Sequence, residues 1–131
     1  MQQPDFHMHG WSLDDGEVYH RRAPTTFPIP SLGTRNSLRP GDFAKLIFVI
    51  AVDNTDKPIA YERMWVLVRD SRPGGYLGVL DNDPTKIAKN EMLWSGTELP
   101  FEARHVIAVL PGDESSRRMA LLPPRRPWLP S

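Results

Sequence analysis

The segment from Gly41 to Pro84 decides the fold class, and it reads GDFAKLIFVIAVDNTDKPIAYERMWVLVRDSRPGGYLGVLDNDP. Residues 43–52 are apolar at almost every position, which predicts a strand that is buried on both faces. Residues 61–69 alternate between two faces, as expected of a strand with one side on a core. The loop between them is rich in Asp and Asn, so the two strands are expected to form an antiparallel hairpin.

Further strands complete the predicted sheet. A Pro-Gly-Gly turn within residues 71–75 leads to the next strand, in which Gly78 indicates a bulge or a sharp bend. Asp83 and Pro84 predict the N-cap and first position of a short helix that ends near Asn90. The remaining strands are expected at 76–80, 97–101 and 104–110. The sequence therefore predicts a mainly β fold, either a small half-open SH3-like β-barrel or a strongly bent antiparallel sheet, with one short helix.

Prolines divide the chain into three parts. They crowd residues 24–40 and residues 123–130, whereas those in the middle of the chain fall mostly at predicted turns. Proline lacks a backbone donor and restricts the residue before it, so both crowded segments are expected to be extended, irregular or polyproline-like. We expect an N-terminal arm that packs on the core (1–40), a β-barrel core (41–110) and a basic proline-rich tail (111–131).

Length and composition exclude several classes of protein. A chain of 131 residues is expected to form one domain. It has no cysteine, which excludes disulfides, thiolate zinc sites and cysteine nucleophiles. The longest apolar run, residues 46–52, is too short to cross a bilayer, and residues 1–10 do not resemble a secretory signal. We therefore expect a soluble cytoplasmic protein without membrane contact.

A series of short motifs resembles an uncharacterised family of small bacterial domains. The series runs GDxxKLxF, ERMWVxV, GxLxNxP and GxxxxFxxxHVI, and it covers about residues 38–110. The matching residues are Gly41, Asp42, Lys45, Glu62, Arg63, Met64, Trp65, Gly78, Leu80, Asn82, Pro84, Gly96, Phe101 and His105. The resemblance implies a small cytoplasmic protein without an established activity. Some relatives are similar to immunity proteins of bacterial toxin systems.

The first candidate binding site is one face of the strand at 61–69. Tyr61, Arg63 and Trp65 share this face, and an arginine between two aromatic residues is typical of binding hot spots. The competing interpretation, which we favour for Trp65, is that its ring fills the core while Glu62 and Arg63 pair with neighbouring strands.

The second candidate is the tail, where Arg125, Arg126 and Trp128 lie among prolines with PxxP spacing. This composition is typical of a polyproline ligand for an aromatic groove. The alternative is a C-terminal strap that buries Trp128 against its own domain, and the arm could wrap the barrel in the same way.

Catalytic and metal sites have weaker support in the sequence. Glu62, Asp81 and Asp83 could form an acid–base pair, but turns and caps explain the two aspartates. His7 and His9, with His20 or His105, could bind a metal, but ligands on a mobile N-terminus are rarely preorganised. There is no nucleophile elbow and no phosphate-binding loop. We expect no cofactor and no metal, and we do not expect an enzyme.

The predicted function is a non-catalytic protein-binding module, such as an immunity-type inhibitor or an adaptor in bacteria. The alternative is a nucleic-acid-binding small β-barrel, in which Arg21, Arg22, Arg35, Arg39 and the tail arginines contact phosphates. The balance of 16 basic and 16 acidic residues argues against a nucleic-acid partner. A small hydrolase is the third possibility. The oligomeric state is not predicted.

Overall fold

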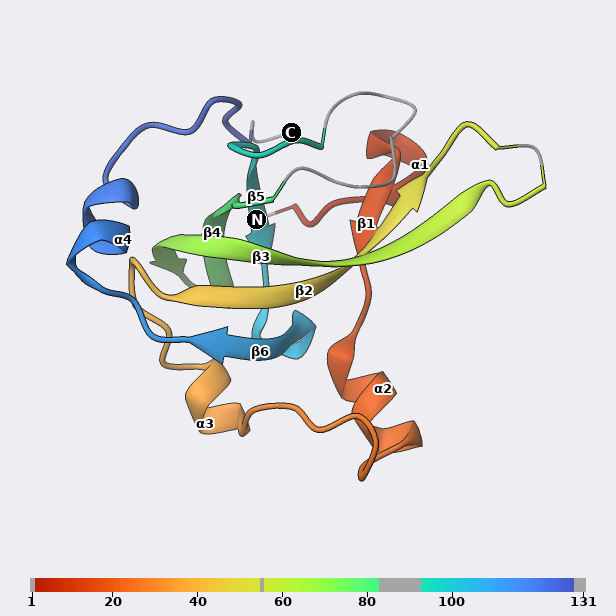
Figure 1. Cartoon of the computed structure of the whole chain (residues 1–131), viewed down its shortest axis with the longest axis horizontal. Helices are drawn as coiled ribbons and strands as arrows, with labels where there is room; N and C mark the ends of the chain where they lie inside the picture. Colours follow the sequence, from red (N-terminus) through yellow and green to blue (C-terminus); the bar gives the residue numbers. More distant parts are fainter. Residues whose placement is uncertain (1, 55, 83–92, 129–131) are drawn as a thin grey trace.

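The computed structural model describes residues 2–54, 56–82 and 93–128 (Figure 1). Its strands form a strongly curled antiparallel sheet, a half-barrel, which confirms the predicted fold class. Their bounds are β1 (Trp11–Leu13), β2 (Phe43–Ala51), β3 (Ile59–Arg72), β4 (Gly75–Leu80), β5 (Glu98–Phe101) and β6 (Val106–Leu110).

The order of the strands is β1-β2-β3-β4-β5, and β6 also pairs with β2. β3 covers one edge of β2, whereas β1 and β6 lie end to end along the other edge. The predicted hairpin of β2 and β3 is confirmed. The tight turn between β3 and β4 is confirmed as well: Gly74 follows Pro73 and has a φ of 81°, the positive value that the third residue of a type II turn requires. The arm supplies β1, so its residues belong to the sheet itself.

The core fills the concave side of the sheet. Alternate residues of β2 and β3 point into it, and Trp11 of β1 is also fully buried there. Gly78 faces Val68 across β3 and β4, and the register shifts between Val68 and Asp70, so the bulge lies on β3 opposite this glycine and not in the strand where it was predicted. The buried apolar side chains of β2 and β3 on this side are Ala44, Leu46, Phe48, Ile50, Met64, Val66 and Val68.

Short helices occupy the arm and the tail, which we had expected to be extended or irregular. Asp5, Asp15, Ser31 and Asp113 each precede a helix and accept hydrogen bonds from its first backbone N–H groups. Of these capped helices, the one after Ser31 lies within the proline-crowded residues 24–40, and the other three lie outside both crowded segments. The helices are α1 (Phe6–His9), α2 (Gly16–Arg22), α3 (Leu32–Arg35), α4 (Glu114–Met119) and the 3₁₀ helix η1 (Ala103–His105). The helix predicted at 83–90 lies outside the described residues.

Arg35 joins the arm to the core. The residue is 5% exposed, and its guanidinium lies 2.6 Å from a carboxylate oxygen of Glu17. It also donates to the carbonyl oxygens of Pro30 and Ala103, and the Tyr76 hydroxyl donates to the backbone carbonyl oxygen of Arg35. An arginine that the nucleic-acid alternative assigned to phosphates is therefore a structural residue of the interior.

The buried imidazole of His105 predicts a loss of stability in acid. Its Nδ1 accepts from the backbone N–H of Glu102 at 2.9 Å, and burial together with Arg104 lowers the pKa of His105 to about 4. The unfolded chain, with a histidine pKa near 6.5, binds the proton first. Stability is therefore fully present above pH 6.5 and falls by roughly 2–3 kcal/mol as the pH drops through 4. Urea unfolding at a series of pH values measures this, and His105→Gln should flatten the dependence; an equal acid loss in that variant would contradict the assignment.

Candidate functional site

The outer face is the side of β2 and β3 that points away from the core. The register pairs Lys45 with Trp65, Ile47 with Arg63 and Val49 with Tyr61. Because neighbouring residues of these strands face the core, these six side chains lie together on the outer face. The structure thus brings together Tyr61, Arg63 and Trp65, as the alternation predicted.

Trp65 does not fill the core, so the interpretation that we favoured for it is wrong. The core side of β3 is occupied by Met64 and Val66, which leaves the indole of Trp65 half-buried on the outer face. The ammonium of Lys45 lies 5.5 Å from the centre of its ring, within the range of a cation–π contact. The backbone N–H of Trp65 donates to the side chain of Asn82 at 2.7 Å.

Arg63 is exposed and lies over an aromatic ring of the arm. Its guanidinium carbon is 5.1 Å from the centre of the Phe27 ring, which in turn packs on Tyr19. The Tyr19 hydroxyl donates to Asp14 at 2.6 Å, and this hydrogen bond raises the pKa of Tyr19 to about 12. The arm therefore supports Arg63 from beneath, and this support could not be recognised from β3 alone.

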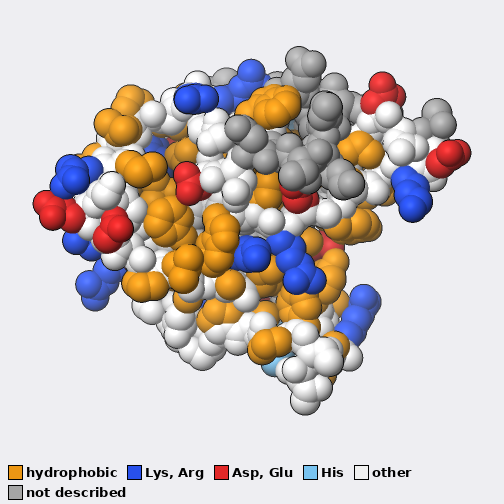
Figure 2. All heavy atoms as spheres, in the orientation of Figure 1, with side chains coloured by type: hydrophobic (Ala, Val, Ile, Leu, Met, Phe, Trp, Pro, Cys, Tyr) orange, Lys and Arg blue, Asp and Glu red, His pale blue; other side chains and the backbone are white. Residues whose placement is uncertain are grey.

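The outer face is largely apolar and carries positive charge. Along the paired stretch of β2 (43–51) with β3 (59–67), the outward-pointing charged residues are Lys45 and Arg63, whereas Asp70 and Arg72 follow beyond the bulge of β3. Figure 2 shows hydrophobic side chains gathered over β2, β3 and β6, with basic side chains near the middle. Several large apolar side chains here are exposed, namely Tyr61 at 61%, Leu110 at 51% and Ile59 at 43%. An exposed apolar patch with aromatic and basic groups is typical of an interaction surface.

A second candidate site lies where the tail crosses the open side of the half-barrel. Residues 125–128, which we call the strap, run along the free edge of β5, with Thr97 and Arg126 forming a parallel bridge. The Trp128 ring lies 6.0 Å from Trp11 and 4.8 Å from His9. The strap therefore connects the β5 edge with the β1 edge. The structure thus agrees with the second interpretation of the tail, in which it packs on its own domain. An edge strand covered in this way cannot pair with other chains.

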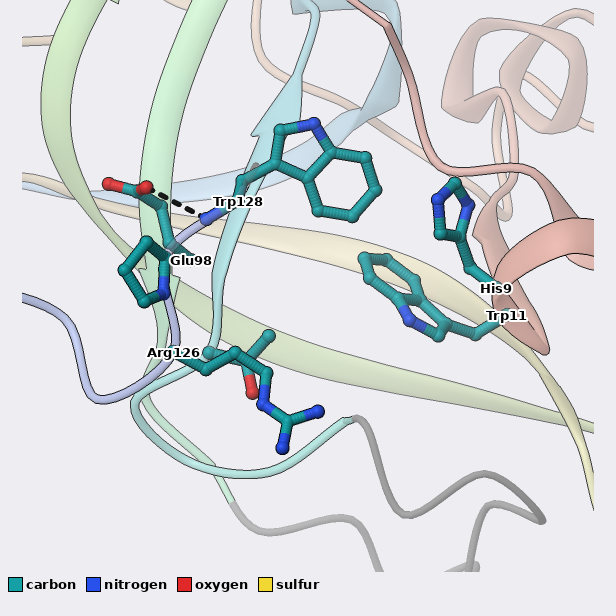
Figure 3. Close-up of a pocket in the computed structure, with 7 residues that line it drawn as sticks. His9, Trp11, Glu98, Arg126 and Trp128 are labelled. Atoms are coloured by element: carbon teal, nitrogen blue, oxygen red, sulfur yellow. Dashed lines mark hydrogen bonds between the residues drawn. The ribbon is translucent and has the colours of Figure 1, made fainter. Parts of the chain in front are cut away.

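A pocket of about 310 Å³ remains in this seam between β1 and β5 (Figure 3). His9 and Trp11 come to it from the arm, Glu98 comes from β5, and Arg126 and Trp128 come from the strap. Aromatic rings form much of its wall. The tail residues Arg126 and Trp128, predicted from composition, thus meet arm residues whose part in the site the sequence did not indicate.

Glu98 holds the strap and is itself held by an ion pair. It is 7% exposed, and its carboxylate lies 2.6 Å from Arg69 while accepting the backbone N–H of Trp128 at 3.0 Å. Arg69 also donates to the carbonyl oxygen of Ala120, just after α4. The carboxylate is therefore used for structure, and it does not have the solvent access of a general base.

The other candidate residues do not form a site together. Within the described part of the chain, no group of three or more His, Asp or Glu side chains is placed to hold a metal ion. His20 contacts the carbonyl oxygen of Phe27, and His105 caps η1, so each of these two imidazoles has a structural partner. Partial burial raises the pKa of Asp81, but its predicted partner Asp83 lies outside the described residues. Arg125 is exposed, and its side-chain stem lies over Gly96.

Comparison with known proteins identifies no relative: no family model, no curated protein and no solved structure matches the chain. The described residues contain no helix with the length and apolar content needed to cross a bilayer. A function can therefore be proposed only from the surfaces and contacts of this chain.

Proposed function

We propose that this chain is a non-catalytic protein-binding module that holds an acidic region of a partner protein on its outer face. The observation that carries the proposal is the pair of cations on aromatic rings, Lys45 on Trp65 and Arg63 on Phe27, within an apolar sheet face. Tryptophan, tyrosine and arginine are enriched among the few residues that dominate the binding energy of protein interfaces. Because Lys45 and Arg63, the two charged residues within the apolar stretch of this face, are both positive, an acidic partner surface is complementary to it.

An immunity-type inhibitor is the form of this function to test first. The resemblance of residues 38–110 to a bacterial family with immunity-like relatives supports it over an adaptor. Such a protein would act in the cytoplasm by covering the active surface of a toxin, in a fixed stoichiometry and without turnover. A toxin gene beside the gene for this chain would favour the inhibitor, and neighbours that are all metabolic genes would favour the adaptor.

Affinity capture from the source cells tests the binding surface. We expect the wild-type chain to recover one stoichiometric acidic protein, and the double variant Tyr61→Ala, Arg63→Ala to lose it. Both side chains are exposed, so the variant should keep its melting temperature. The matched control is Arg118→Ala, because Arg118 is an exposed arginine on α4 that pairs with Glu114.

Two results would contradict the proposal. One is recovery of the same protein by the double variant and the wild type in equal amounts. The other is recovery of nucleic acid in place of protein, with an affinity that falls steeply with added salt, as counterion release requires.

A further inference from the structure

The strap contacts the sheet as a bound peptide would. The backbone N–H groups of Arg125 and Arg126 donate to the carbonyl oxygen of Gly96 at 3.0 and 3.3 Å, and the N–H of Glu98 donates to the carbonyl oxygen of Arg126 at 2.9 Å. Backbone bonds of this kind depend little on side chains, and they add an extended segment to the edge of a sheet. The edge of β5 is therefore suited to an added strand.

The side chains of the strap supply specificity. The Trp128 indole packs on His9 and Trp11, and its Nε1 donates to the carbonyl oxygen of Gln2 at 3.2 Å. Gly96 has a φ of 95°, and a side chain in its place would meet the stem of Arg125. The seam thus recognises a long side chain at one position and a tryptophan three positions later.

The segment that joins the strap to the rest of the chain is exposed. Leu121 and Leu122 are 80% and 61% exposed, and their backbone N–H groups donate back to the last residues of α4. Pro123 and Pro124 follow them. Because this connection does not pack in the core, the strap can leave the seam while the sheet stays folded.

We propose that the seam between β1 and β5 is a second peptide-binding site, which takes a segment of the type Arg-Arg-Pro-Trp from a partner protein when its own strap is displaced. The occupant is defined by the strap itself: an extended backbone, an arginine stem over Gly96 and a tryptophan between His9 and Trp11. This site lies apart from the outer face and does not depend on the function proposed for that face.

The test uses the full chain with Trp128→Ala and a labelled hexapeptide of residues 123–128, Pro-Pro-Arg-Arg-Pro-Trp. We expect the peptide to bind this variant at least about tenfold more tightly than the wild type, because a tethered strap competes at an effective concentration on the order of 1 mM. Fluorescence anisotropy measures the affinity. A peptide with alanine in place of its tryptophan is the control and should not bind. Absence of saturable binding to a folded variant would overturn the proposal.

A second measurement covers the case in which Trp128→Ala does not fold. Wild-type chain labelled with ¹⁵N is titrated with unlabelled hexapeptide, and the indole N–H signal of Trp128 is followed by NMR. We expect this signal to move towards the position of a solvent-exposed indole as the peptide replaces the strap. A signal that stays in place at several times the effective concentration of the tether, on the order of several mM, would also overturn the proposal.

Discussion

Replacing Gly78 with alanine is expected to destabilise the fold by more than ~3 kcal/mol. A Cβ atom on this residue would collide with a methyl group of Val66 and lie 2.8 Å from the carbonyl oxygen of Leu67. It would also lie 3.1 Å from the ring of Phe101, so both strand pairing and core packing would have to move. Because β4 pairs here with β3 on one side and β5 on the other, a shift of its backbone would disturb both ladders.

Urea unfolding of Gly78→Ala measures this loss. Gly33→Ala is the matched control, since the nearest side-chain atom to its new methyl group would be 4.0 Å away and the residue lies within α3. The control is expected to be neutral or to stabilise the chain by about 0.5–1 kcal/mol. Equal urea midpoints for Gly78→Ala and the wild type would show that β3, β4 and the Phe101 ring do not pack around this position as described.

Replacing Glu98 with alanine is expected to destabilise the protein by about 3–4 kcal/mol and to release the strap. The substitution removes the carboxylate that lies 2.6 Å from the guanidinium of Arg69, and it leaves this partly buried cation without its ion-pair partner. It also removes the acceptor for the backbone N–H of Trp128. The measurements are the unfolding midpoint and the NMR signal of the Trp128 indole N–H, which should shift towards the position of an exposed indole.

An exposed ion pair serves as the control for Glu98. Arg72 and Asp70 lie 2.7 Å apart, with side chains about half exposed, and Asp70→Asn should cost less than about 1 kcal/mol. If Glu98→Ala costs no more than Asp70→Asn, then Glu98 does not anchor the strap.

The fold could be predicted where its signals are local. The apolar run of β2, the alternation of β3 and the Pro-Gly turn after it are readable within a few residues, and the structure has them within three residues of the expected bounds. β1 was missed because a strand of three residues is too short to show a period. The helices of the arm and tail were missed although Asp15 and Asp113 are ordinary capping residues, because the prolines at 24–40 and 123–130 were taken to indicate that the whole arm and tail are extended.

The candidate sites were predictable only in part. Alternation alone places Tyr61, Arg63 and Trp65 on one side of a strand, but it does not say which side faces the core. The ring of Phe27 under Arg63 comes from a distant part of the chain, and no local pattern indicates that contact. The seam joins His9 near the start of the chain to Trp128 near its end, so it exists only after folding.

The most direct test of the outer face as a binding surface is the dissociation constant of the recovered partner, measured by calorimetry for the wild type, Arg63→Ala and Arg118→Ala. Arg63 lies on Phe27 at the exposed part of the face, whereas Arg118 lies on α4 and pairs with Glu114. We predict that Arg63→Ala weakens binding at least about 30-fold, the loss of about 2 kcal/mol that marks a hot spot, and that Arg118→Ala changes it less than about twofold. An Arg63→Ala chain that binds the partner as tightly as the wild type would contradict the account.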